Sequence, residues 1–314
     1  MADNIGININ DTVSTAMERW LYRYKKNGVK TATFDRLIIS FKMLIGYKLA
    51  SVRLIDLCTS DIQDFINSLM NDGYSMSTIR KGYNLMTAFV KFVIGEGLAI
   101  RPVYLNVILP KAENVKCEVR EVRAYDPDEQ ARLRAVISKS DSMAAKAILL
   151  MLETGIRVGE ALALHWSDVL WQRRALRIHT TLVRGVSQKK CIVQSSPKSK
   201  SSVRTIPLSK TALDMLASMK RDGADGFIFT AADGTTPLGY NSCRKKALDL
   251  HLEAEVPFSG FHVLRHTFAT NAFYKGCEIK ILSKLLGHSS VTITYNTYIH
   301  LYGDALEEMR SIVG

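Results

Sequence analysis

The chain has 314 residues, of which 47% are hydrophobic, a length and composition that suit two globular domains. No run approaches the roughly 18 apolar residues of a membrane-spanning helix, and residues 1–20 lack the basic-then-apolar pattern of a secretory signal. Lysine and arginine number 42 against 30 acidic residues, a formal net charge of +12 at pH 7. This excess favours an anionic partner, nucleic acid first, because phosphates bind lysine and arginine.

The five cysteines are scattered along the chain without CxxC spacing. Their odd number and wide separation argue against a disulfide framework and a zinc site, and they fit a reducing cytoplasm. The HExxH metal motif and the GxxxxGK[ST] phosphate-binding loop are absent as well. The sequence therefore predicts a cytoplasmic protein that needs no metal.

The first part of the chain, residues 1–108, is predicted to be a helical domain. Apolar residues recur at helical spacing in four stretches, 12–26, 31–48, 59–73 and 75–98, joined by short connections. The third stretch opens on capping residues and closes on Gly73, so both of its ends are marked. Four such helices indicate one compact domain.

A change of character follows the fourth helix. Prolines and mixed charges interrupt the apolar periodicity, which places a linker at 109–124. The second predicted domain, 125–314, begins with helices at 126–138, 141–153 and 157–166. Strand-like stretches follow at 175–183, 191–194 and 202–208, and helices return from Ser209, with a short apolar interruption at 226–230. The chain is therefore predicted to be mainly α-helical, with one small sheet in its second domain.

The second domain carries basic residues in a pattern that suits chemistry on a phosphate. His262 and Arg265 are three apart in a helical stretch and share a face. Glu160 lies three residues after Arg157, where a carboxylate can hold a guanidinium in one orientation. His288 lies between two helical stretches, so its ring can point inward from a loop.

These residue types point to attack of an oxygen nucleophile on a phosphodiester. Two guanidiniums can stabilise the charge that develops on the non-bridging oxygens. A tyrosine, whose ordinary pKa is about 10, needs a base or nearby positive charge to act as the nucleophile. A lysine can protonate the departing sugar oxygen. The candidates are Tyr295 or Tyr298 for the first role, and Lys198 or Lys200 for the second.

Four stretches resemble, in this order, the catalytic domain of tyrosine recombinases, the phage integrase family: TGIRVGEALALHWSDV, SPKSKSSVRTIPL, FHVLRHTFAT and LLGHSSVTITYNTYIH. The resemblance covers residues 125–314, and residues 1–108 resemble the family's helical, SAM-like core-binding domain. The motifs are most similar to those of integrases from conjugative transposons and Gram-positive phages. The resemblance implies a mostly helical catalytic domain with a small antiparallel β-sheet.

The resemblance also implies a role for each basic residue of the motifs. Arg157 and Arg265 would bind the scissile phosphate from two sides. His262 and His288 would hydrogen-bond the same phosphate and handle protons. Glu160 would brace the region around Arg157. No cofactor is implied for this chemistry.

The nucleophile and the general acid follow from the same motifs. Tyr298 in TYIH matches the family's nucleophile, which would form a 3′-phosphotyrosyl link on the way to a Holliday junction; Tyr295 is the alternative. Lys198, the first lysine of PKSK, would protonate the 5′-hydroxyl, with Lys200 as the alternative. His266 is predicted to point elsewhere and to make a structural hydrogen bond.

DNA contacts and assembly are implied as well. The two domains would close around duplex DNA, with basic residues positioning the phosphates without reading the sequence. The residues expected to do so are Lys25, Lys26, Lys30, Arg80 and Lys81 in the first domain, and Arg184, Lys189, Lys190 and Arg204 in the second. The amphipathic C-terminal segment 301–314 is expected to pack on a neighbouring subunit, linking four protomers on DNA.

The resemblance thus predicts a site-specific recombinase that integrates or excises a mobile element in the cytoplasm of a bacterial host. Accessory DNA-bending or directionality proteins are further expected partners. A type IB topoisomerase is the alternative enzyme, because it uses the same residue types on a single duplex. A catalytically silent DNA-binding regulator is the alternative outside the enzymes, and the intact catalytic set argues against it.

Overall fold

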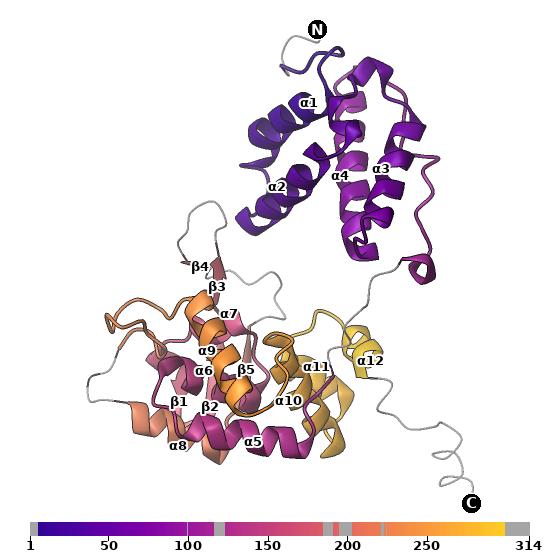
Figure 1. Cartoon of the computed structure of the whole chain (residues 1–314). Coiled ribbons are helices and arrows are strands. Elements are labelled where there is room, and N and C mark those ends of the chain that lie inside the picture. The colour runs from indigo at the N-terminus through magenta and orange to yellow at the C-terminus, as the bar shows by residue number, and fades with distance from the viewer. Residues whose placement is uncertain are drawn as a thin grey trace, which may run out of the picture. The chain divides into compact units, whose positions relative to one another are not determined.

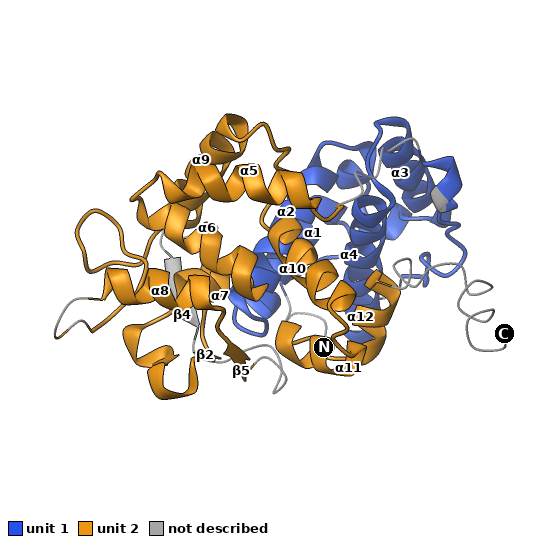
Figure 2. Ribbon diagram, turned by 90° about the horizontal axis from the view of Figure 1, so that it is seen from below, with its two compact units in different colours: residues 1–120, 185–189 blue, residues 121–184, 190–314 orange. Residues whose placement is uncertain are grey.

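The computed structural model describes residues 6–98, 100–115, 123–184, 191–194, 203–220, 223 and 225–298. The chain divides between residues 120 and 121 into two compact units, coloured separately in Figure 2. The described residues up to 115 belong to the first unit, and those from 123 belong to the second. The division falls inside the segment 109–124 where the sequence places a linker. Every helix within the described ranges is too short or too polar to cross a lipid bilayer.

In its described residues the first unit contains four α-helices (Figure 1), and the prediction of a helical first domain is confirmed. They are α1 (Val13–Trp20), α2 (Thr31–Ile45), α3 (Thr59–Asn71) and α4 (Met76–Gly95). Short helical turns cover Leu21–Lys25, Lys48–Ser51, Leu54–Asp56 and Ala112–Asn114. Thr12 and Ser75 cap α1 and α4, because each hydroxyl oxygen accepts a hydrogen bond from an amide of the first turn.

The apolar stripes of these helices meet in one core. Trp20 and Phe89 are buried side by side, with ring centroids 5.6 Å apart. Gly82 lets α4 approach its neighbours closely, since a Cβ there would lie 3.2 Å from the ring of Phe65 and 3.3 Å from the methyl group of Met43. The periodicity that predicts the helices therefore also predicts the face that each one buries.

Helices dominate the second unit as well (Figure 1). They are α5 (Pro127–Ser138), α6 (Met143–Thr154), α7 (Val158–Leu162), α8 (Lys210–Met219), α9 (Tyr240–Glu253), α10 (His262–Tyr274), α11 (Ile279–Leu286) and α12 (Val291–Tyr298). Single 3₁₀ turns cover Trp166–Asp168 and Trp171–Arg173. The mainly helical fold class predicted from the sequence is confirmed.

In the described residues of this unit, five short strands form two small antiparallel sheets. The strands are β1 (Val169–Leu170), β2 (Ala175–Ile178), β3 (Thr181–Arg184), β4 (Cys191–Gln194) and β5 (Arg204–Pro207). One sheet has the order β1-β2-β5 and the other pairs β3 with β4. The predicted strand at 175–183 is split because His179 bonds to Asp168 and the Thr180 hydroxyl donates to the carbonyl of Ala163.

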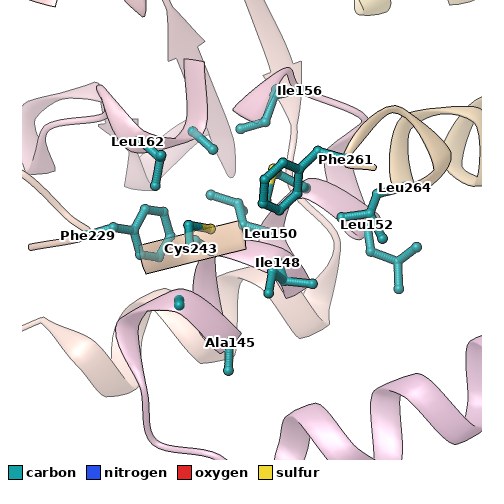
Figure 3. Packing of buried hydrophobic residues seen from close by; sticks show 14 of the residues in the cluster. Ala145, Ile148, Leu150, Leu152, Ile156, Leu162, Phe229, Cys243, Phe261 and Leu264 are labelled. Atoms are coloured by element: carbon teal, nitrogen blue, oxygen red, sulfur yellow. The ribbon is translucent and has the colours of Figure 1, made fainter. Parts of the chain in front are cut away.

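Helix α6 lies at the centre of the second unit and packs against α5, α7, α8, α9 and α10. It is apolar on nearly every side, which is typical of a helix with neighbours all round. Figure 3 shows its residues Ile148, Leu150 and Leu152 in a cluster with Phe229 and Phe261. This packing fixes the position of the C-terminal end of α6. Arg157 lies three residues after that end, so its position depends on this packing.

Candidate active site

The end of α6 places the first functional residues. Gly155 ends the helix with a left-handed backbone, φ 65°, and a Cβ at this position would overlap the ring of Phe268. The Gly155 carbonyl accepts a hydrogen bond from Nη1 of Arg265 at 3.0 Å. Arg157 follows as the residue before α7. A glycine fits here because it adopts the left-handed conformation without strain and leaves room for the ring of Phe268.

Glu160 is a buried carboxylate that holds two arginines at once. Its oxygens accept hydrogen bonds from the backbone amide of Arg157 at 2.9 Å and from Nη1 of Arg157 at 3.0 Å. They also accept from Nη1 and Nη2 of Arg204 at 3.1 and 2.7 Å. Burial alone would raise the pKa of Glu160, but Arg204 and Arg157 lower it further, so it lies below its usual value. Glu160 is therefore ionised at neutral pH.

The C-terminal end of α11 holds three guanidiniums through consecutive carbonyl groups. The Leu285 carbonyl accepts from Nε of Arg204 at 2.6 Å, and the Leu286 carbonyl accepts from Nη2 of Arg265 at 2.6 Å. The Gly287 carbonyl accepts from Nη2 of Arg157 at 3.5 Å. A helix C-terminus carries unpaired carbonyls and partial negative charge, which suits cations. This helix end thus gathers residues that are distant in sequence.

The three arginines differ in exposure. The side chain of Arg157 is 38% exposed, whereas that of Arg204 is only 6% exposed and Arg265 is buried. Burial, with the nearby charge of Arg157, lowers the pKa of Arg265 to about 9, so it still carries its charge at pH 7. Three guanidiniums against one carboxylate leave an excess of positive charge. Such a cluster is suited to a phosphate anion.

The two predicted histidines belong to the same electrostatic neighbourhood. His262 is the first residue of α10, and burial together with Arg265 and Arg157 lowers its pKa. His288 follows the left-handed Gly287, and its Nδ1 lies 2.7 Å from Oγ1 of Thr294. Burial and the charges of Arg265, Arg157 and Arg204 lower the pKa of His288 to about 4. The ring of His288 is therefore neutral at pH 7.

The two candidate tyrosines of α12 lie in different surroundings. Tyr298 is 3% exposed and packs in a small apolar cluster with Ala269 of α10 and Leu286 of α11. Its Oη lies 3.2 Å from Nδ1 of His266. Burial raises the pKa of Tyr298 to about 12, although the charge of Arg265 acts in the opposite direction. Tyr295 is 44% exposed, whereas Tyr298 is buried and lies close enough to Arg265 for that charge to act on its pKa.

Two expectations about this region are wrong. The sequence predicts that Arg204 contacts DNA phosphates from the surface, but its guanidinium is buried against Glu160 and the end of α11. The alternation of side chains along β5 indicates that Arg204 faces the interior, because Arg204 lies on the same face of the strand as the buried Ile206. The sequence also predicts that His266 points elsewhere and makes a hydrogen bond. The hydrogen bond is present, but it is to the predicted nucleophile Tyr298, so the ring does not point elsewhere.

The other predicted site residues are placed only in part. Lys198, Lys200, Lys189, Lys190 and the segment 301–314 lie outside the described residues, as does the side chain of Arg184. In the first unit, Lys26, Lys30, Arg80 and Lys81 are exposed, while Lys25 is half-buried with Nζ 5.2 Å from the Trp20 ring centroid. Arg80 and Lys81 line a shallow depression at the start of α4 with Met76, Ser77 and Asn84.

Within the described ranges, no group of three or more histidine, cysteine or acidic side chains is arranged to hold a metal ion. Fixed guanidiniums beside neutral imidazoles and a phenol suit chemistry on a phosphodiester. A sequence model of the phage integrase family matches residues 124–304, more than half of the chain. The chain therefore belongs to this family, the tyrosine recombinases, which act on DNA.

Individual relatives agree with this assignment. A tyrosine recombinase XerC-like protein of Caldanaerobacter subterraneus subsp. tengcongensis is 29% identical over 92% of this chain and 79% of its own length. The Tn1549 transposon integrase in complex with transposon right end DNA has the same fold, with a TM-score of 0.77 and 22% identity. It covers 97% of this chain and 100% of the Tn1549 chain. A lambda integrase tetramer bound to a Holliday junction aligns with a TM-score of 0.67 and 20% identity over 94% of this chain and 78% of that one.

Proposed function

We propose that this tyrosine recombinase integrates or excises a mobile DNA element through a covalent 3′-phosphotyrosyl intermediate. The observation that supports the proposal most strongly is the pocket in which Glu160 and the end of α11 gather Arg157 and Arg265 beside Tyr298. The likeness to a transposon integrase and to lambda integrase supports the mobile element as the source of the DNA. We expect the protein to act on this DNA in the bacterial cytoplasm.

The proposed reaction proceeds in two reversible steps. Oη of Tyr298 attacks the scissile phosphorus, a P–O bond to tyrosine forms, and the bond to the 5′ oxygen breaks. Lys198 donates the proton that the departing 5′ oxygen needs. A 5′-hydroxyl from the partner strand then attacks the phosphotyrosyl link and releases the tyrosine. Arg157 and Arg265 offset the charge on the non-bridging oxygens in both transition states.

The arrangement of the site supports a way of binding the phosphate before the reaction. The two guanidiniums are held in place, because Nη1 and Nη2 of each donate hydrogen bonds to Glu160 or to backbone carbonyls. Neutral His262 and His288 can donate a hydrogen bond to a phosphate oxygen without adding charge. Preorganised donors of this kind lose little free energy to reorientation during the reaction.

Trapping on a nicked suicide DNA tests this function directly. The nick lets the short 5′ fragment diffuse away, so the covalent protein–DNA product accumulates. We expect Tyr298→Phe to abolish the product and Tyr295→Phe to retain it, since Tyr295 is exposed. The proposal is wrong if the wild-type chain forms no covalent product with any site from the element's ends. Loss of product in Tyr295→Phe with retention in Tyr298→Phe would reassign the nucleophile.

We also infer that the active assembly is a homotetramer on DNA joined by the segment 301–314. The support is the amphipathic pattern of that segment and the tetramer that lambda integrase forms on a Holliday junction. Deleting residues 303–314 should abolish recombination between paired sites and retain binding to a single site. Unchanged strand exchange by the shortened chain would contradict the inference.

A further inference from the structure

One contact of the nucleophile is not explained by the residues that bind the phosphate. Oη of Tyr298 on α12 lies 3.2 Å from Nδ1 of His266 on α10, and the two ring centroids are 5.7 Å apart. His266 comes one helical turn after His262 and directly after Arg265. A base that takes a proton must be within about 2.6–3.2 Å of the atom that carries it. His266 meets this condition.

The other basic groups of the pocket are less suited to this proton. His288 has its Nδ1 engaged with Thr294, and the surrounding arginines lower its pKa to about 4, which makes it a weak base. His262 is likewise disfavoured as a cation by Arg265 and Arg157. Glu160 is already bound by two arginines. In the described part of the chain, His266 is the side chain that shares a hydrogen bond with Oη.

We propose that His266 is the general base that accepts the phenol proton as Tyr298 attacks the scissile phosphorus. The O–H bond of Tyr298 breaks, its electron pair forms the P–O bond, and the proton moves to Nδ1 of His266. In the return step, the attacking 5′-hydroxyl gives its proton to the Lys198 amine, which the first step left neutral. Its oxygen forms the new P–O bond, the phenolate leaves, and His266 returns its proton to the phenolate. The proposal rests on the proposed phosphotyrosyl chemistry and adds the acceptor that this chemistry needs.

Three groups face His266 from the packed elements. Arg265 neighbours it on α10, His288 lies near it in the loop after α11, and Tyr298 contacts it from α12. A bound scissile phosphate adds negative charge among these groups, and nearby negative charge favours an imidazolium. We therefore expect proton transfer to His266 to be favoured once the scissile phosphate is bound.

Replacing His266 by asparagine distinguishes a role in proton transfer from a role in packing alone. In His266→Asn the amide oxygen stands near the position of Nδ1 and can still accept a hydrogen bond from Tyr298, but it cannot take the proton. We expect single-turnover cleavage of suicide DNA at pH 7 to fall by roughly 100- to 10,000-fold. The rate of the variant should rise with pH over a range in which the wild-type rate is level, because hydroxide replaces the missing base.

A sulfur leaving group isolates the proton that Tyr298 loses. In DNA with a 5′-bridging sulfur at the scissile position, the departing group needs no acid. Lys198→Ala should recover cleavage on this DNA, whereas His266→Asn should remain slow. His179→Asn, which removes an imidazole bonded to Asp168, is the matched control for loss of a histidine from this unit. His266→Ala adds a second test, since added imidazole should restore part of its rate.

The outcomes are distinct. Wild-type rate and pH profile in His266→Asn would overturn the proposal and leave His266 as a spacer. Slow cleavage in His266→Asn that follows the wild-type pH profile, with no rescue of His266→Ala by imidazole, would also overturn it. DNA binding and thermal unfolding show whether each variant is folded. If the wild-type chain forms no Tyr298 adduct, the proposed function itself fails; if it does, only the role of His266 is in question.

Discussion

The two units of the chain treat their charged side chains in opposite ways. In the first unit, among the described residues, Asp35 is the only charged side chain that is buried, and the predicted DNA-contact residues lie at or near the surface. The second unit buries Glu129, Glu160, Asp168 and Arg265. Burying a charge is costly unless it is paired and hydrogen-bonded. The second unit therefore holds a set of fixed, buried charges, whereas the charged side chains of the first unit remain mostly at the surface.

The second unit contains its own internal comparison. Asp168 is buried and bonds to Arg177 and His179, both of which are partly exposed. Glu160 instead bonds to Arg204, which is as buried as the carboxylate itself. The first arrangement ties a turn to strand β2 at little electrostatic cost. The second keeps positive charge inside the protein, where an arriving phosphate is less screened by water.

Glu160→Gln should produce the largest effect on folding. The amide keeps the shape of the side chain but leaves the buried Arg204 without a counter-charge. Breaking a buried pair in this way costs about 3–5 kcal/mol of the free energy of unfolding. Urea unfolding at pH 7 measures the loss. Glu113→Gln, at an exposed carboxylate paired with Lys111, is the control and should change stability little.

The stability loss in Glu160→Gln should also depend on pH. The pKa of Glu160 is lowered in the folded chain, so its stabilising effect is complete above its unfolded pKa of about 4.3 and is lost as the pH falls through the folded value. The stability gap between the wild type and Glu160→Gln should therefore be constant near neutral pH and narrow below about pH 4. A gap that widens in acid would contradict the ionised pair.

Arg265→Lys should have the next largest effect. We expect it to lower the rate of DNA cleavage more than the stability of the fold. A lysine carries the charge but cannot reach the carbonyls of Gly155 and Leu286 while also binding a phosphate. We expect a loss of roughly 100- to 1,000-fold in single-turnover cleavage at saturating DNA. Arg177→Lys, at a partly exposed arginine outside the pocket, is the matched control. Equal rates in both variants would show that charge alone suffices.

Substitutions in the first unit should have the smallest effect, and that effect should appear in the salt dependence of DNA binding. Arg80→Gln with Lys81→Gln removes two exposed cations beside a shallow depression on α4. DNA affinity should fall, and the slope of log affinity against log salt should decrease by about 1 for each phosphate that the variant no longer neutralises. Lys48→Gln removes one charge from another exposed position of this unit and serves as the control. A salt slope that stays unchanged in the double variant would place the DNA elsewhere.

Much of the fold could be predicted from local signals. The capping residues Thr12, Ser75 and Asp126 mark helix starts, and Gly155 and Gly287 mark helix ends. These residues act on their own neighbours, so a sequence displays them directly. The same holds for the contact between Arg157 and Glu160, which depends on one turn of helix.

The rest depends on tertiary packing. No local pattern shows that the carbonyls at the end of α11 bind arginines from β5, α10 and the start of α7. Nor does the position of His266 beside Arg265 show that α12 brings Tyr298 against it. Only the alternation along β5 could have indicated that Arg204 faces the interior. The supporting contacts of the site were therefore harder to predict than its principal residues.

The central claim is that fixed guanidiniums hold the negative charge of one phosphate while Tyr298 attacks it. Cleavage by Arg157→Ala of DNA with a neutral methylphosphonate at the scissile position tests this claim most directly. If Arg157 stabilises the negative charge of the scissile phosphate, Arg157→Ala should slow cleavage strongly on ordinary DNA and much less on the methylphosphonate DNA. An equal loss on both substrates would contradict the claim.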